Sequence, residues 1–95
     1  MSVYIVSRVN LTDEAAMTSY FTAAPVTVEQ YGGKYLARTN DLTPLEGGEE
    51  IDRMVILEFP TKEAAEAWYH SEEYKPLRDQ RWASSDAKII LLPGE

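Results

Sequence analysis

Three short segments of the chain are apolar at consecutive positions, and this feature limits the fold more than any other. The segments are rich in Val, Ile and Leu and cover residues 3–9, 53–59 and 88–92. Each is too short for a free-standing helix and is typical of a β-strand. Because successive side chains of a strand point to opposite faces, these runs predict a sheet that is apolar on both faces.

The segment after the first strand has the periodicity of an amphipathic helix. Apolar side chains recur at spacings of three and four at Met17, Phe21, Ala24 and Val28. Thr12 or Asp13 offers an N-cap, and Gly32-Gly33 is expected to end the helix. Pro25 removes a backbone donor, so we expect a kink near residues 23–25 or a restart of the helix at Pro25.

The remaining segments complete a regular order of elements. Residues 34–38 are expected to form a short strand, followed by an acidic loop over residues 39–51. Thr61 is expected to cap a second helix, and residues 71–83 a turn with a short helix broken at Pro76. The order strand–helix–strand–strand–helix–strand predicts an α+β domain of the ferredoxin-like βαββαβ type, with a four-stranded antiparallel sheet.

Two helices can cover only one face of such a sheet. A monomer would leave the second apolar face in water, so we expect a homodimer formed through this open face. The alternative is that residues 71–83 or the loop 39–51 fold over it.

Composition limits the function classes. A chain of 95 residues fits one domain over residues 1–95, and the net charge of −7 argues against nucleic acid as a partner. Cysteine is absent, which excludes disulfides and thiolate metal sites and fits a cytoplasmic protein. No segment has the roughly 20 apolar residues of a membrane span. His70 is the only histidine, so we expect no metal site and no tightly bound cofactor.

Two residues are weak candidates for catalysis. Glu58 lies within an apolar strand, where a carboxylate needs a cation such as Arg38 or Arg8. The carboxylate of Glu58 either takes part in a structural ion pair or acts as a catalytic or ligand-orienting group. His70 ends the second helix and is either a surface residue favoured by the helix dipole or a general base.

Four residues are candidates for binding a small ligand between sheet and helices. Arg38 and Arg81 carry planar guanidinium groups suited to carboxylate or phosphate. Ser71 and Tyr74 offer hydroxyl donors within an unusually aromatic part of the chain. Aromatic side chains also dominate ordinary cores, so core packing is the alternative for the tyrosines and tryptophans.

Several blocks of the sequence resemble one family over almost the whole chain. They are Val3-Tyr4-Ile5-Val6, Ala23-Ala24-Pro25, Tyr31-Gly32-Gly33-Lys34-Tyr35-Leu36-Ala37-Arg38, Leu57-Glu58-Phe59-Pro60 and Ala67-Trp68-Tyr69-His70-Ser71-Glu72-Glu73-Tyr74-Lys75-Pro76-Leu77. Together they resemble the DUF1330 family of small bacterial proteins of unknown function. His70 stands where such sequences often have Asp or Asn, and Glu73 where Pro is usual.

The resemblance implies a ferredoxin-like fold of the dimeric α/β-barrel type and no settled activity. Related dimeric barrels include cofactor-independent monooxygenases, muconolactone isomerase-like enzymes and haem-dependent peroxidases, which is an analogy of fold alone. Because polar residues are set among aromatic ones, we expect a protein that binds a small organic acid or an aromatic metabolite in a pocket between sheet and helices, either without catalysis or as a cofactor-independent enzyme. The alternative is a structural or regulatory dimerisation module without chemistry.

Overall fold

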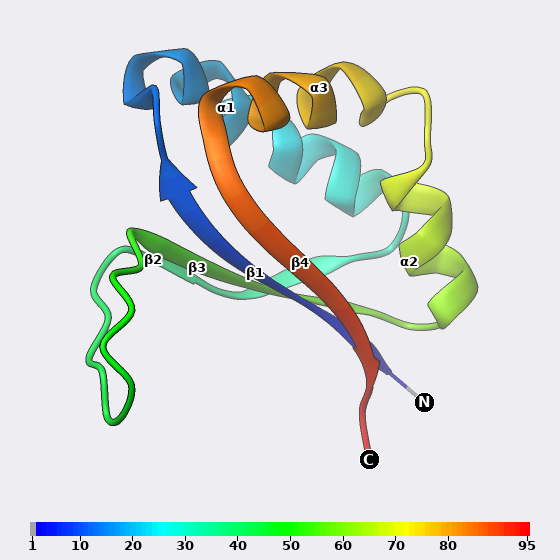
Figure 1. Ribbon diagram of the computed structural model, residues 1–95. Coiled ribbons are helices and arrows are strands. Elements are labelled where there is room, and N and C mark those ends of the chain that lie inside the picture. Colours follow the sequence, from blue (N-terminus) through cyan, green and yellow to red (C-terminus); the bar gives the residue numbers. More distant parts are fainter. Residues whose placement is uncertain (1) are drawn as a thin grey trace.

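The computed structural model describes residues 2–95 and has a layer of helices on one face of an antiparallel sheet (Figure 1). The elements in chain order are β1 (Val3–Leu11), α1 (Glu14–Gln30), β2 (Lys34–Thr39), β3 (Arg53–Phe59), α2 (Lys62–Tyr69), α3 (Lys75–Ser84) and β4 (Ser85–Pro93). The four strands lie in the order β2-β3-β1-β4. The ferredoxin-like α+β prediction is confirmed, and the short helix expected within residues 71–83 is α3.

Polar caps set the starts of the first two helices. The Asp13 side chain accepts from the backbone N–H of Ala16 at 3.1 Å, and Thr61 Oγ1 accepts from that of Ala64 at 3.1 Å. Each bond satisfies a donor that the first turn leaves free. The predicted restart at Pro25 is wrong, because α1 continues through it from Glu14 to Gln30.

Pro76 begins a helix and does not break one. It lies in the first turn of α3, where the missing N–H has no helical partner in any case. Gln80 Nε2 on α3 donates to the carbonyl oxygen of Ala16 on α1, which joins the two helices in one layer. The α3 helix therefore belongs to the helix layer and leaves the other face of the sheet uncovered.

Gly33 allows the end of α1 to approach the sheet closely. A Cβ atom placed at this position would lie 2.6 Å from the Phe59 ring and 2.8 Å from Val28 Cγ1. Both neighbours are buried in the core between sheet and helices. Only glycine leaves room for this contact, which fixes where β2 begins beside the core.

The sheet has a helix-facing side and an open face, and the alternation in β1 separates them. Val3, Ile5, Ser7 and Val9 are buried against the helices. The open face carries the intervening residues of each strand: Tyr4, Val6, Arg8, Met54, Ile56, Glu58, Ile90 and Leu92. Its apolar centre is the row Ile56, Val6 and Ile90, which are direct partners across three strands.

The segment between β2 and β3 does not cover the open face. Its base is tied to β1, where Asn10 Nδ2 donates to the Glu50 carbonyl at 3.0 Å and the Leu11 N–H donates to Asp52 Oδ2 at 2.8 Å. Ile90 remains 62 % exposed. The alternative in which this loop or residues 71–83 fold over the open face is therefore wrong. No helix within residues 2–95 is long and apolar enough to span a bilayer.

Candidate ligand-binding pocket between the sheet and the helices

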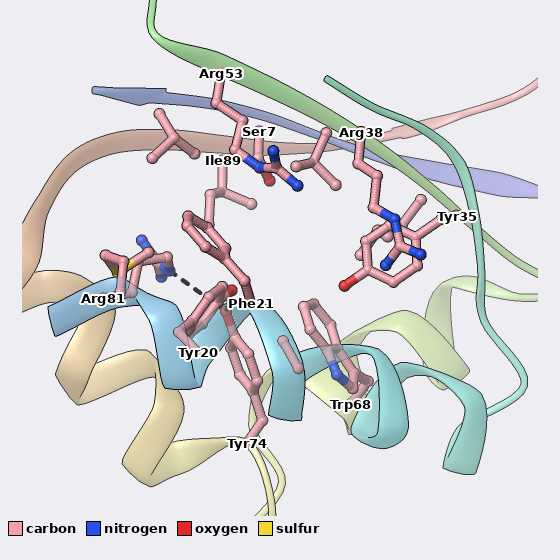
Figure 2. A pocket seen from close by; sticks show the side chains of 15 residues that line it. Ser7, Tyr20, Phe21, Tyr35, Arg38, Arg53, Trp68, Tyr74, Arg81 and Ile89 are labelled. Atoms are coloured by element: carbon pink, nitrogen blue, oxygen red, sulfur yellow. Dashed lines mark hydrogen bonds between the residues drawn. The ribbon is translucent and has the colours of Figure 1, made fainter. Parts of the chain in front are cut away.

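A central pocket lies between the helix-facing side of the sheet and the helix layer, with a cavity volume of about 40 Å³. Figure 2 shows Ser7, Tyr35, Arg38, Arg53 and Ile89 reaching it from the strands. Tyr20, Phe21, Trp68, Tyr74 and Arg81 reach it from the helical side. Each of the strands and helices contributes at least one lining side chain, so the pocket depends on the whole fold.

Arg81 is a buried cation without a counter-ion. It lies on α3, is 3 % exposed and makes no salt bridge with any of residues 2–95. Its Nε donates a long hydrogen bond of 3.4 Å to the Tyr74 hydroxyl, and its buried Nη2 has no partner. A buried charge normally needs a paired and hydrogen-bonded environment, so this guanidinium is a ready site for an anion.

Two tyrosines extend the polar wall beside Arg81. The hydroxyls of Tyr20 and Tyr74 lie 2.6 Å apart, and Tyr74 is completely buried. Burial, reinforced by the Tyr74 hydroxyl, raises the pKa of Tyr20 well above its usual range. Burial also raises the pKa of Tyr35. The hydroxyls of Tyr20 and Tyr35 therefore remain protonated at neutral pH.

Arg38 and Arg53 are the cations on the strand side of the pocket. The Arg38 guanidinium lies 4.4 Å from the centre of the Tyr35 ring, and that of Arg53 lies 4.8 Å from the centre of the Phe21 ring. Arg53 Nη1 also donates to Asn40 Oδ1 at 3.0 Å. Neither guanidinium is paired with a carboxylate within residues 2–95. Aromatic faces hold both groups in place without neutralising their charge.

The charge of the pocket is opposite to that of the chain. Its lining contains Arg38, Arg53 and Arg81 and no Asp or Glu, whereas the chain as a whole has a net charge of −7. A concave site lined by one sign of charge raises the local concentration of ions of the other sign. The lining therefore favours an anionic guest.

Aromatic packing makes the helical wall of the pocket rigid. The rings of Trp68 and Tyr74 lie 4.3 Å apart between centres, and Trp68 Nε1 donates to Thr27 Oγ1 at 3.0 Å. Thr27 in turn donates to the Ala24 carbonyl at 2.7 Å. The indole is thus held by α1 as well as α2, which fixes the position of Tyr74 beside it.

Three of the four predicted binding residues lie at the pocket. Arg38, Tyr74 and Arg81 line it. Ser71 does not line it. Its hydroxyl donates to the Trp68 carbonyl at 2.8 Å and accepts from the Tyr74 N–H at 3.1 Å. Ser71 therefore holds the turn that presents Tyr74.

The two catalytic candidates lie away from the pocket. Glu58 is on the open face and pairs with Lys34 at 3.2 Å. The expected partners were wrong, because Arg8 pairs with Glu49 at 3.2 Å and Arg38 points to the other face of the sheet. His70 is an exposed residue that ends α2. It lies beside a separate groove lined by Ile5, Ala65, Glu66, Tyr69, His70, Ile89 and Leu91.

The sequence analysis did not identify Arg53, Tyr35 and Ser7 as pocket residues. The alternation of side chains along the strands could have identified two of them. Arg53 shares its face with Val55 and Leu57, and Ser7 shares its face with Ile5 and Val9. A polar residue on the core-facing side of a strand needs a polar environment there. The same argument could not identify Tyr35, because an irregularity in strand pairing between Tyr35 and Ala37 breaks the alternation of side chains in β2.

Metal-ligating groups are not gathered in the part of the chain that the structure describes. Among residues 2–95, no three or more His, Asp or Glu side chains are placed to hold one metal ion. The pocket gathers guanidinium and hydroxyl groups around an aromatic and aliphatic interior.

Comparison with solved structures places the fold among known ferredoxin-like proteins. A protein of unknown function from Rhodopseudomonas palustris is 20 % identical, with a TM-score of 0.84 over 99 % of this chain and 82 % of that one. A dimeric ferredoxin-like protein of unknown function from Jannaschia sp. CCS1 is 12 % identical, with a TM-score of 0.76 over 99 % and 100 % of the two chains. At these identities the likeness shows the fold alone.

A more distant neighbour has a known chemistry. It is a cofactor-independent oxygenase from Streptomyces nogalater, 16 % identical, with a TM-score of 0.70 over 99 % of this chain and 93 % of that one. No curated protein sequence matches the chain. The profile of the family described as a domain of unknown function, DUF1330, matches residues 2–95. The chain therefore belongs to the DUF1330 family.

Proposed function

We propose that this protein binds a small organic anion, an organic acid or an aromatic metabolite, in the central pocket. The observation that carries the proposal is Arg81, a guanidinium that is 3 % exposed, has an unpartnered Nη2 and has no counter-ion. An anion at this position supplies the missing partner. The hydroxyls of Tyr20 and Tyr74 share one hydrogen bond, which leaves one of their two protons as a further donor, and Arg38 and Arg53 add charge on the strand side.

The size of the cavity limits the guest. A volume of about 40 Å³ holds a few water-sized groups, whereas sites for drug-sized ligands are about 300–1,000 Å³. A compact acid therefore fits with little rearrangement. A larger aromatic metabolite requires side chains that line the pocket to move.

Thermal unfolding in the presence of organic acids tests this proposal. A ligand at 100 times its Kd stabilises the folded state by about 2.7 kcal/mol. We expect an acid to raise the Tm of the wild type and of Arg8→Gln, which removes a charge on the open face, but not that of Arg81→Gln. A shift that persists unchanged in Arg81→Gln, or no shift with any member of a broad acid panel, contradicts the proposal.

The same experiment addresses the alternative of a dimerisation module without chemistry. In that case the variants Arg38→Gln and Arg81→Gln change stability only, and no acid distinguishes them from the wild type. The catalytic version of the proposal has less support, because Glu58 and His70 both lie outside the pocket. The groups that meet a guest are arginines and tyrosines, which suit binding more directly than proton removal.

We also propose that two copies pair through the open face of the sheet. The support is the apolar row of Ile56, Val6 and Ile90, with Leu92 beside it, together with structural neighbours described as dimeric. Pairing removes this surface from water and leaves the central pocket, on the opposite face, free in each copy.

A further inference from the structure

The three arginines of the central pocket are divided between two sides. Arg81 comes from α3, whereas Arg38 and Arg53 come from β2 and β3. In Figure 2, Arg81 and Arg38 lie at opposite ends of the pocket, with aromatic rings between them. A ligand with one charged group can balance the positive charge at only one of these ends.

Arg38 and Arg53 are placed to act on the same group. Arg38 is the direct partner of Val55 across β2 and β3, so Arg53 is its diagonal neighbour on the same face. Diagonal neighbours have Cα atoms about 7–8 Å apart, within reach of long side chains. Both side chains line the central pocket, and no carboxylate lines it to balance their two positive charges. An anion held between them does so.

The rest of the lining is mostly apolar. It includes the side chains of Phe21, Val55, Leu57 and Ile89, and the hydroxyls of Ser7 and Tyr35 are polar groups among them. No charged side chain other than the three arginines lines the pocket, so a further charged centre in the ligand would lose its water without gaining a counter-ion. A hydrocarbon chain or an aromatic ring therefore suits the middle of the ligand.

The Arg38 end also opens toward a second space. A groove of about 300 Å³ between α1 and β2 shares Tyr35 and Arg38 with the central pocket and is also lined by Pro25, Val28, Glu29, Gly33 and Lys34. Arg38 itself is exposed. A guest longer than the 40 Å³ cavity can therefore place its outer end beside Arg38, and its charge there keeps contact with water.

We propose that the guest is a dianion, a dicarboxylic acid with an apolar or aromatic middle. One carboxylate lies at Arg81, and the other lies between Arg38 and Arg53. This assignment rests on the proposed function and narrows it, because it states how many charged groups the ligand has and where each one binds.

Calorimetric titration with matched acids tests the assignment. The probes are succinate with butyrate, glutarate with valerate, adipate with hexanoate, and terephthalate with 4-methylbenzoate, so that each pair differs mainly in the second carboxylate. We expect at least one diacid to bind the wild type about tenfold or more tightly than its monoacid, equivalent to about 1.4 kcal/mol.

Variants locate the effect at each end. In Arg38→Gln/Arg53→Gln the preference for the diacid is expected to fall to less than about twofold, because the second carboxylate loses both of its cationic partners. Arg38→Lys/Arg53→Lys keeps the charge and is expected to retain a preference. Arg81→Gln is expected to lose both acids, and Arg8→Gln serves as the control with the same change of charge elsewhere. Far-ultraviolet circular dichroism confirms folding, and Arg38→Gln alone, at an exposed position, replaces the double variant if that variant unfolds.

The outcomes separate the two proposals. If a monoacid binds as tightly as its diacid, the dianion assignment is wrong while anion binding at Arg81 stands. If inorganic phosphate binds at Arg38 and Arg53 as tightly as any diacid does, without dependence on Arg81, the two-ended assignment is also wrong. If no acid binds the wild type, the proposed function itself fails.

Discussion

The two sides of the sheet differ in whether their cationic side chains have carboxylate partners. On the open face, Arg8 and Lys34 each pair with a carboxylate, at 3.2 Å to Glu49 and 3.2 Å to Glu58. On the helix-facing side, Arg81 is more deeply buried than either and has no carboxylate partner within residues 2–95. The more deeply buried cation, which most needs a counter-ion, is therefore the one without a carboxylate partner.

This difference distinguishes the open face, which suits an interface between two copies, from the central pocket, which suits a bound anion. Paired charges around an apolar centre suit an interface, where each charge is already satisfied before a second copy approaches. Unpaired charges in an enclosed site reduce stability until an anion arrives, which is the usual cost of a preformed binding site. The predictions below test each side of this comparison.

The largest effect is expected at the centre of the open face. Val6→Asp puts a carboxylate between Ile56 and Ile90, its two direct partners, neither of which is a cation, and the cations Arg8 and Lys88 lie one pair further along the strands. Burying an unpaired charge costs several kcal/mol, so the dimer should weaken about a hundredfold or more. Sedimentation over a concentration series measures this. Val26→Asp, at a 57 % exposed position of α1, is the matched control and should leave association unchanged. A Val6→Asp protein that sediments like the wild type rules out this interface.

The next effect concerns the unpaired cation. Arg81→Met replaces the buried guanidinium by an apolar side chain of similar length, and we expect the free energy of unfolding to rise by about 1–4 kcal/mol. Arg8→Met, which breaks the ion pair on the open face, should lower it by about 1 kcal/mol or less. Urea unfolding at one protein concentration compares them. A marked loss of stability in Arg81→Met would make Arg81 a structural residue.

The buried tyrosines give a smaller effect that depends on pH. Burial raises the pKa of Tyr20 in the folded state, so as pH rises above about 10 the unfolded chain loses its phenol proton first. The stability that Tyr20 contributes is therefore complete below pH 10 and falls as pH rises further. Urea unfolding between pH 8 and 11 should show a shallower fall for Tyr20→Phe than for the wild type. Equal slopes would mean that Tyr20 is hydrated in the folded protein.

The smallest effect is expected at the ion pair of the open face. Glu58→Gln breaks the contact with Lys34, whose side chain is 68 % exposed, so the loss of stability should be about 0.2–1 kcal/mol and should shrink in high salt. Acid binding in the central pocket should be unchanged, since Glu58 lies on the opposite face. Weaker acid binding in Glu58→Gln would show that the two faces are not independent.

Much of the fold followed from local patterns. The strand Arg53–Phe59 has the predicted bounds, and Asp13 and Thr61 cap the helices that they were expected to cap. Pro25 and Pro76 were interpreted wrongly because proline alone does not say whether packing will hold a helix through it or begin one beside it. Ser71 was placed in the pocket because a hydroxyl near aromatic residues looks the same whether it faces a guest or caps a turn.

The sequence by itself determined the order of elements, the two apolar faces of the sheet and the family. These depend on periodicity and on caps, which act between residues that are close along the chain. Only the tertiary structure decided which charges are paired. Arg81 and Tyr20 both line the pocket although they lie 61 residues apart in the chain. Within the single strand β3, Arg53 points to the pocket and Glu58 points to the open face. Which carboxylate reaches which cation depends on distances across the sheet and between layers, and these exist only after the chain has folded.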